Sequence, residues 1–163
     1  MINIILGIPV LLAILTLLIK KQRILGILTS IGYLAVLFDS ILLFRRVLIS
    51  GNIKLYADFI YIDALSAFFI FVIAIVAFAS SFYSVGYIER DIEKGIISDR
   101  KAKIYYLLFN LFCCSMLFAP AVNNLGILWV AIEMTTLISA FLVGFYNSKE
   151  SVEAAWKYII ICS

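Results

Sequence analysis

The sequence predicts an all-α integral membrane protein with about six transmembrane helices. Hydrophobic residues fill 65% of the 163 positions and charged residues only 14%, against about 25% in soluble domains. The apolar residues also gather in runs of about 20, the length that a helix needs to cross the core of a bilayer. Composition and run length together exclude a soluble enzyme.

Five apolar runs are long enough to span a membrane, and a sixth begins but stays short. Their ranges are approximately 2–19, 24–44, 62–85, 104–122 and 125–146, with the incomplete sixth at 152–163. The first has no basic region before it and no small-residue cleavage site, so we expect it to remain in place instead of acting as a removable signal peptide. The sixth ends without a cap or breaker. We therefore expect residues 1–163 to be a single membrane domain, the N-terminal portion of a longer subunit.

Two connecting segments are polar enough to carry structure of their own, at 45–61 and 86–103. Within the first, Asn52 to Ile62 alternates apolar and polar residues imperfectly, which favours a short strand or hairpin on the membrane surface. The second carries mixed charge, and Gly95 is its predicted break.

The basic residues predict the orientation of the chain. Nine of the 13 follow the first, third and fifth runs, and three lie on the opposite side. The excess of Lys and Arg marks the cytoplasmic side of a membrane protein, so we expect a multi-pass protein of the cell membrane with its N-terminus outside. The nine are Lys20, Lys21, Arg23, Arg90, Lys94, Arg100, Lys101, Lys103 and Lys149; the three are Arg45, Arg46 and Lys54. Because the basic residues are scattered between apolar runs, no nucleic-acid partner is expected.

The chain carries no recognisable catalytic, cofactor-binding or metal-binding motif. It contains no histidine, and its three cysteines, Cys113, Cys114 and Cys162, form no CxxC pair. Haem, zinc and iron–sulfur sites need clusters of those ligands. We therefore expect no redox centre in this chain, and buried cysteines that pack as small apolar residues.

Glu133 is the strongest candidate functional residue. It lies inside the apolar run LGILWVAIEMTTLISAFLVGFY, which spans Leu125 to Tyr146. An ionised side chain at the centre of a membrane helix costs on the order of 3 kcal/mol, and such residues mark ion or proton pathways. The alternative is a structural carboxylate hydrogen-bonded to Thr135, Thr136 or a neighbouring helix.

Lys157 is the second candidate, in the next apolar segment, AAWKYIIICS. In an antiparallel hairpin of the last two runs its level differs from that of Glu133 by about 12 Å, too far for a direct salt bridge. Lys157 is therefore either a step between the cytoplasm and Glu133 or a lysine whose ammonium reaches back to the lipid headgroups.

The other acidic residues near helix ends have structural explanations. Asp63 opens the third run in the string YIDALSAFF and is predicted to be its N-cap. Glu150 and Glu153 suit the positive end of the helix dipole in the first turn of the sixth run. Asp39 precedes Arg46 by seven residues, which allows an interfacial pair without a functional role.

A family resemblance rests on three strings. WVAIEMTTLISAFLVGFY, followed by ESVEAAWKYIIICS, resembles the fifth and sixth spans of antiporter-like, proton-pumping membrane subunits, and DALSAFF is similar to the opening of their third span. These subunits occur in respiratory complex I, in hydrogenases of the hydrogenase-4 or formate hydrogenlyase type, and in Mrp-type sodium/proton antiporters. The nearest likeness is to the hydrogenase-associated members, since Ile132 stands where many complex I members place an aromatic residue.

The resemblance implies that Glu133 is the family's fifth-span glutamate and Lys157 its sixth-span lysine. It also implies a non-redox membrane subunit of a proton- or sodium-translocating hydrogenase or NADH dehydrogenase-like complex, with other membrane subunits as partners. The partner lysine that the family carries on a broken seventh helix has no counterpart within residues 1–163. Two alternatives stay open: an Mrp-type antiporter subunit without a redox partner, and a non-conducting membrane scaffold.

Overall fold

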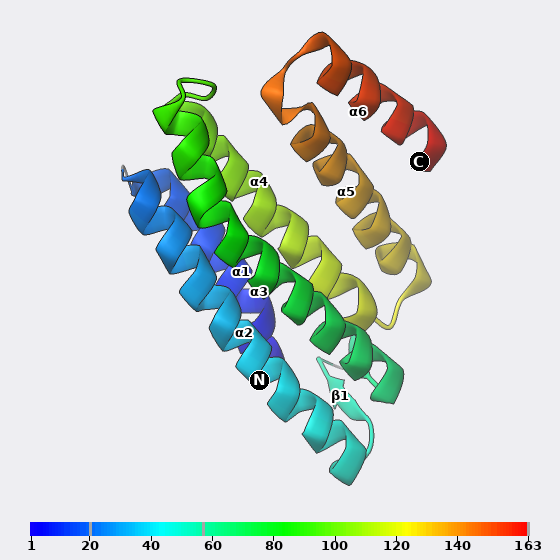
Figure 1. Ribbon diagram of the computed structural model, residues 1–163. Helices are drawn as coiled ribbons and strands as arrows, with labels where there is room; N and C mark the ends of the chain where they lie inside the picture. Colours follow the sequence, from blue (N-terminus) through cyan, green and yellow to red (C-terminus); the bar gives the residue numbers. More distant parts are fainter. Residues whose placement is uncertain (20, 57, 163) are drawn as a thin grey trace.

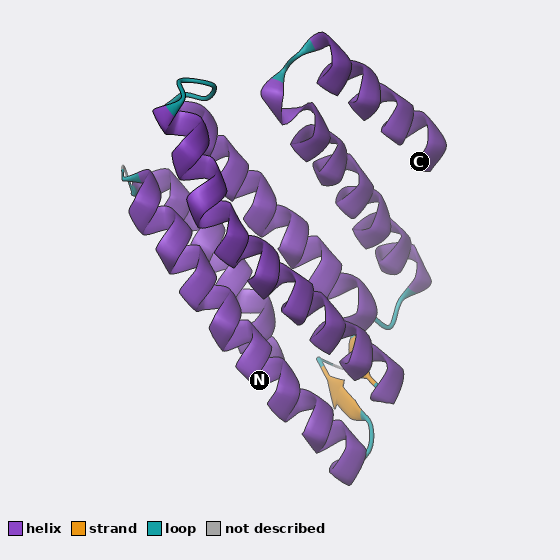
Figure 2. Cartoon of the chain, in the orientation of Figure 1, coloured by secondary structure: helices purple, strands orange, loops and turns teal. Residues whose placement is uncertain are grey.

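The computed structural model describes residues 1–19, 21–56 and 58–162 (Figure 1). Within these residues the chain forms six α-helices and one small antiparallel sheet (Figure 2). The all-helical prediction is confirmed. Lys20, which contributes to the predicted charge asymmetry, and Ser163, the last residue of the sixth run, lie outside the described residues. The helices are α1 (Ile2–Leu18), α2 (Gln22–Ser50), α3 (Ala64–Glu93), α4 (Asp99–Phe118), α5 (Leu125–Val143) and α6 (Lys149–Cys162).

Four of these helices are long and apolar enough to cross a membrane. They are α2, α3, α4 with the 3-10 turn η1 (Ala119–Ala121), and α5 with the 3-10 turn η2 (Gly144–Tyr146). Helix α1 is apolar but has 17 residues, and α6 has 14. At 1.5 Å per residue α1 is about 25 Å long, close to the thickness of a bilayer core, whereas α6 reaches only about 21 Å.

Two helices extend well beyond the apolar runs that predicted them. Helix α2 continues through Arg45 and Arg46 to Ser50, and α3 continues through Arg90 to Glu93. Arg and Glu are good helix formers, so backbone hydrogen bonding continues after the apolar composition ends. The connections are consequently shorter than the polar segments 45–61 and 86–103 indicated.

The predicted surface hairpin is present and joins α2 to α3. Strands β1 (Ile53–Leu55) and β2 (Ile60–Ile62) pair antiparallel, with Ile53 opposite Ile62. The hairpin is tied to the connection between α4 and α5, because the backbone N–H of Asn123 donates to the carbonyl oxygen of Phe59 at 3.0 Å.

The core lies among α1 to α4. Small residues on α3, Ala67, Ala74 and Ala77, are buried together with Ile70, and small side chains let membrane helices approach closely. A polar contact crosses the same core, where the fully buried Tyr33 hydroxyl of α2 donates to Asn110 Oδ1 of α4 at 3.0 Å. Figure 1 shows α5 beside α4, and α6 beside α5, at the edge of this bundle.

The helices alternate in direction, so their connections gather at two ends. At one end Gln22 Nε2 donates to the carbonyl oxygen of Asp99 at 2.7 Å, which joins the start of α2 to the start of α4. At the same end the Tyr146 hydroxyl donates to Asp91 Oδ2 at 2.5 Å. Nine basic residues were predicted to lie on the cytoplasmic side. Those that the structure describes lie in the connections or helix ends at this end of the molecule.

Candidate ion-path residues on α5 and α6

Helix α5, which carries Glu133, begins and ends at well-defined caps. Asn124 Oδ1 accepts from the backbone N–H of Ile127 at 3.1 Å, so a neutral side chain caps the helix start. After η2, Asn147 adopts a left-handed backbone with φ 54°, a conformation that asparagine tolerates better than most residues. The chain reverses there into α6.

Glu133 lies near the middle of α5, and its side chain is half-buried. Eight residues separate it from Leu125 and ten from Val143, which correspond to about 12 Å and 15 Å along the helix axis. The two residues flanking it, Ile132 and Met134, are exposed. The carboxylate therefore belongs to a helix segment whose outer face is apolar.

Hydroxyl groups join α4 and α5 at Thr135, which lies two residues after Glu133 and on a different side of the helix. Thr135 Oγ1 lies 3.0 Å from Ser115 Oγ of α4 and 2.8 Å from the carbonyl oxygen of Ala131. The Ser115 hydroxyl also reaches the carbonyl oxygen of Phe112 at 2.8 Å. Because each hydroxyl carries one proton and can also accept, this pair can exchange donor and acceptor roles.

Lys157 forms an ion pair within its own helix. Its Nζ lies 2.6 Å from Glu153 Oε1, and the two side chains are 68% and 60% exposed. A glutamate four residues before a lysine is the favourable order on a helix. The helix dipole, from which Glu153 was predicted, is thus joined by an ion pair whose four-residue spacing is visible in the sequence.

Glu133 and Lys157 thus lie on neighbouring helices, since α5 packs against α6. The structural alternative for Glu133 named Thr135 and Thr136 as partners. The Thr135 and Thr136 hydroxyls donate to backbone carbonyl oxygens of their own helix, those of Ala131 at 2.8 Å and Ile132 at 3.2 Å. The assignment of Glu133 and Lys157 to an ion path remains a prediction.

The structure accounts for Asp63 as predicted. Asp63 Oδ1 accepts from the backbone N–H of Ser66 at 2.7 Å and caps the start of α3. This hydrogen bond from Ser66 holds the pKa of the Asp63 carboxyl below its ordinary value. Among the described residues, Asp39 forms no ion pair with Arg46, whose Nη1 lies 3.9 Å from the sulfur of Met1 instead.

A second carboxylate within a helix, that of Asp91 in α3, was not predicted from the sequence. Asp91, only 8% exposed near the end of α3, accepts the Tyr146 hydroxyl at 2.5 Å, and Tyr146 also contacts the Tyr87 hydroxyl at 2.6 Å. No spacing within the sequence pairs residues 55 positions apart, so only the fold brings them together.

The fold and the placement of these groups define a multi-helix membrane protein that carries carboxylates within its helices. The family described as "NADH-Ubiquinone oxidoreductase (complex I), chain 5 N-terminus" matches residues 48–95, which cover the end of α2, the hairpin and α3. The match therefore includes the Asp63 cap and the string DALSAFF.

Three relatives illustrate the similarity. The chain is 36% identical over 104 residues to hydrogenase-4 component F homolog of Methylacidiphilum infernorum, covering 64% of this chain and 22% of the relative. It is 32% identical over 149 residues to F(420)H(2) dehydrogenase subunit N of Methanosarcina mazei, covering 88% and 28%. It is 38% identical over 104 residues to NADH-quinone oxidoreductase subunit L of Mycobacterium tuberculosis, covering 63% and 15%.

The chain is therefore a homologue of antiporter-like membrane subunits of hydrogenase-4, F420H2 dehydrogenase and NADH-quinone oxidoreductase complexes. The resemblance stated from the sequence is confirmed. The chain spans less than a third of the length of each of these relatives.

Proposed function

We propose that this chain contributes an ion path to a redox-driven membrane complex of the hydrogenase or NADH dehydrogenase-like type. The observation that carries the proposal is the half-buried carboxylate of Glu133, near the middle of an apolar membrane helix. The names of the relatives support a redox-driven complex, because they are subunits of hydrogenase-4, F420H2 dehydrogenase and NADH-quinone oxidoreductase.

In this proposal Glu133 takes up and releases a proton, or holds a sodium ion. A nearby cation stabilises the charged carboxylate, whereas withdrawal of that cation favours the protonated form. Electron transfer in partner subunits would move such a cation and so drive transport. The Thr135 and Ser115 hydroxyls, at the contact between α4 and α5, offer hydrogen-bonding groups for a proton that leaves this part of the helix.

Lys157 is the proposed step between the cytoplasmic side and Glu133. Its ammonium is paired with Glu153 at 2.6 Å, and because both side chains are exposed, this pair is weak enough to open. The N-terminus is proposed to lie outside. Labelling by a membrane-impermeant thiol reagent of a single cysteine placed at Asn52, in a cysteine-free background, checks that orientation in intact cells.

The decisive experiment is Glu133→Gln in the complete complex. We expect electron transfer to continue while proton movement, followed by a pH-sensitive dye in sealed vesicles, falls to near background. The substitution keeps the size and hydrogen-bonding capacity of the side chain but removes its charge and its exchangeable acidic proton. Glu133→Asp, which keeps the carboxylate, should retain part of the proton movement.

Glu150→Gln is the matched control, because Glu150 lies in the exposed first turn of α6. It should leave both activities unchanged. Wild-type proton movement in Glu133→Gln would contradict the proposal and favour the membrane scaffold. Repeating the assay with radioactive sodium distinguishes a sodium path from a proton path.

A further inference from the structure

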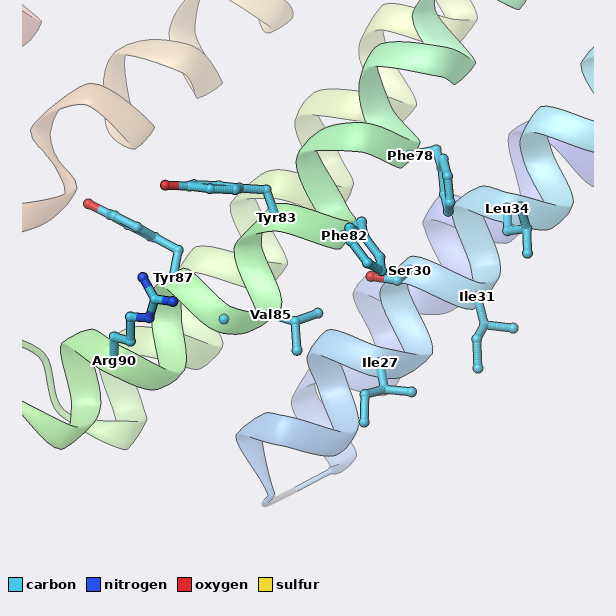
Figure 3. A pocket seen from close by; sticks show the side chains of 11 residues that line it. Ile27, Ser30, Ile31, Leu34, Phe78, Phe82, Tyr83, Val85, Tyr87 and Arg90 are labelled. Carbon is cyan, nitrogen blue, oxygen red and sulfur yellow. The ribbon is translucent and has the colours of Figure 1, made fainter.

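An apolar groove runs between α2 and α3 on the outside of the bundle (Figure 3). Its volume is about 640 Å³. Ile27, Ile31 and Leu34 of α2 line one wall, and Phe78 and Phe82 of α3 line the other. Both helices are long enough to cross a membrane, and most of the apolar side chains that line the groove are exposed.

One buried hydroxyl in this groove has no hydrogen-bond partner within the described residues. Ser30 is 9% exposed, and its Oγ is buried and unsatisfied. Other hydroxyls on α2 donate to their own backbone, as Thr29 does to Leu25 and Ser40 to Leu37, both at 2.7 Å. Figure 3 shows the Ser30 oxygen between the helices beside Phe82. An unsatisfied buried hydroxyl is costly, so a ligand that accepts its hydrogen bond would be favoured.

A positive charge lies at one end of the groove. Arg90 of α3 lines it and forms no ion pair among the described residues, while the neighbouring Glu89 is paired with Arg23 at 3.4 Å. Side chains on a helix lean toward its N-terminus, and Figure 3 shows the Arg90 guanidinium directed toward Tyr87. The arginine is thus available to an anion at the mouth of the groove.

We propose that this groove binds one anionic phospholipid. The phosphate lies against Arg90, and the acyl chains follow the apolar walls. When the exposed ring of Phe82 turns aside, the buried Ser30 hydroxyl opens to the groove and donates to an ester carbonyl oxygen near the glycerol. The eight residues from Phe82, beside Ser30, to Arg90 span about 12 Å of helix. Because the Arg90 side chain leans back along the helix, its guanidinium lies closer to Ser30 than that, which brings the separation toward the distance between the phosphate and the ester groups of a lipid. An apolar transmembrane helix in the same place would leave both Ser30 and Arg90 without partners, which favours the lipid.

Native mass spectrometry of the detergent-solubilised chain tests the proposal. After exchange into nanodiscs of phosphatidylglycerol or of phosphatidylcholine, one phosphatidylglycerol molecule should stay bound and phosphatidylcholine should not. Arg90→Gln should weaken phosphatidylglycerol binding about tenfold, because the substitution removes a charge-assisted hydrogen bond to the phosphate. Ser30→Ala should weaken it less.

A groove-filling substitution gives a second, independent measurement. A Cβ atom at Gly86 meets nothing within 4 Å, and Gly86 lines the groove. Gly86→Leu therefore places a larger side chain in the groove and should abolish lipid retention. Gly7 on α1 also has open space, which makes Gly7→Leu the matched control, and Arg45→Gln is the control for loss of an exposed arginine outside the groove.

Two results would overturn the inference. One is equal retention of both lipids, or unchanged phosphatidylglycerol binding in Arg90→Gln and Gly86→Leu. The other is cross-linking to a protein instead of a lipid from a photoreactive amino acid placed at Ile31 in the native membrane, which would assign the groove to a partner helix. Cross-linking to a lipid whose headgroup is anionic supports the proposal.

Discussion

The α1–α4 bundle and the α5–α6 pair differ in how far each buries its own side chains. The bundle contains most of the fully buried residues, including Ile5, Tyr33, Ile70 and Leu117. In α5 the buried residues are Ala131, Thr136, Ile138 and Ala140, and α6 buries none within its described length. The two candidate ion-path residues lie in the less buried pair.

This difference separates a structural region from the region proposed for function. A dense helix bundle has one well-packed arrangement, because van der Waals contacts hold membrane helices together. Helices with exposed apolar faces can exchange neighbours at lower cost, since lipid solvates those faces. The α5–α6 pair is thus suited to a carboxylate whose surroundings change during transport.

The largest expected difference concerns core packing. Leu117→Ala, at a fully buried position of α4, should lower the free energy of unfolding by about 2 to 4 kcal/mol because it leaves a cavity. Leu137→Ala, at a position of α5 that is 48% exposed, should change it by less than about 1 kcal/mol. Titration with SDS in mixed micelles, followed by circular dichroism, measures both. Equal losses would show that α5 is as tightly packed as the bundle.

A smaller difference should separate the two N-caps by their pH dependence. Asp63→Ala and Asn124→Ala should each cost about 1 kcal/mol at neutral pH, since each removes a cap on α3 or α5. The pKa of Asp63 is lowered in the folded chain, so its stabilisation is present above the ordinary value of about 4 and is lost as the pH falls through the folded pKa. The cost of Asp63→Ala should therefore shrink in acid.

Asn124 does not titrate, so the cost of Asn124→Ala should stay constant over the same pH range. Thermal unfolding of both variants in detergent at pH 7 and near pH 3 measures this comparison. An Asp63→Ala cost that is unchanged in acid would mean that the charge of the cap contributes nothing.

The smallest stability effect is expected for the ion pair on α6. Lys157→Gln and Glu153→Gln should each change the free energy of unfolding by less than about 0.5 kcal/mol, because both side chains are exposed. Their effects on transport should differ, since only Lys157 is proposed as a step in the path. Proton movement in vesicles should fall in Lys157→Gln and persist in Glu153→Gln. Equal rates in the two variants would remove Lys157 from the path.

Local patterns predicted the elements whose causes are local. Apolar runs predicted the helices, an alternating segment predicted the hairpin at 53–62, and an aspartate before ALSAFF predicted the Asp63 cap. Each depends on residues within a few positions of one another. The helices run past their apolar runs at Ser50 and Glu93, because hydropathy records burial in lipid whereas a helix ends where its backbone hydrogen bonds end.

Contacts between distant residues could not be predicted in this way. The hydrogen bond from Tyr146 to Asp91 joins the turn after α5 to the end of α3, and the groove of Ser30 and Arg90 is shared between α2 and α3. Neither leaves a pattern in the chain, because each depends on how the helices are rotated about their axes.

The sequence by itself determined that this protein is a helical membrane protein and which helices it contains. It also determined that a carboxylate lies within one of these helices. Both follow because the free-energy cost of exposing polar groups to lipid is set residue by residue. Only the tertiary structure decided which helix faces meet, which hydroxyls join α4 to α5, and which arginine lies at the end of the groove between α2 and α3. Those outcomes depend on packing between helices, where small differences in side-chain shape select one rotation over another.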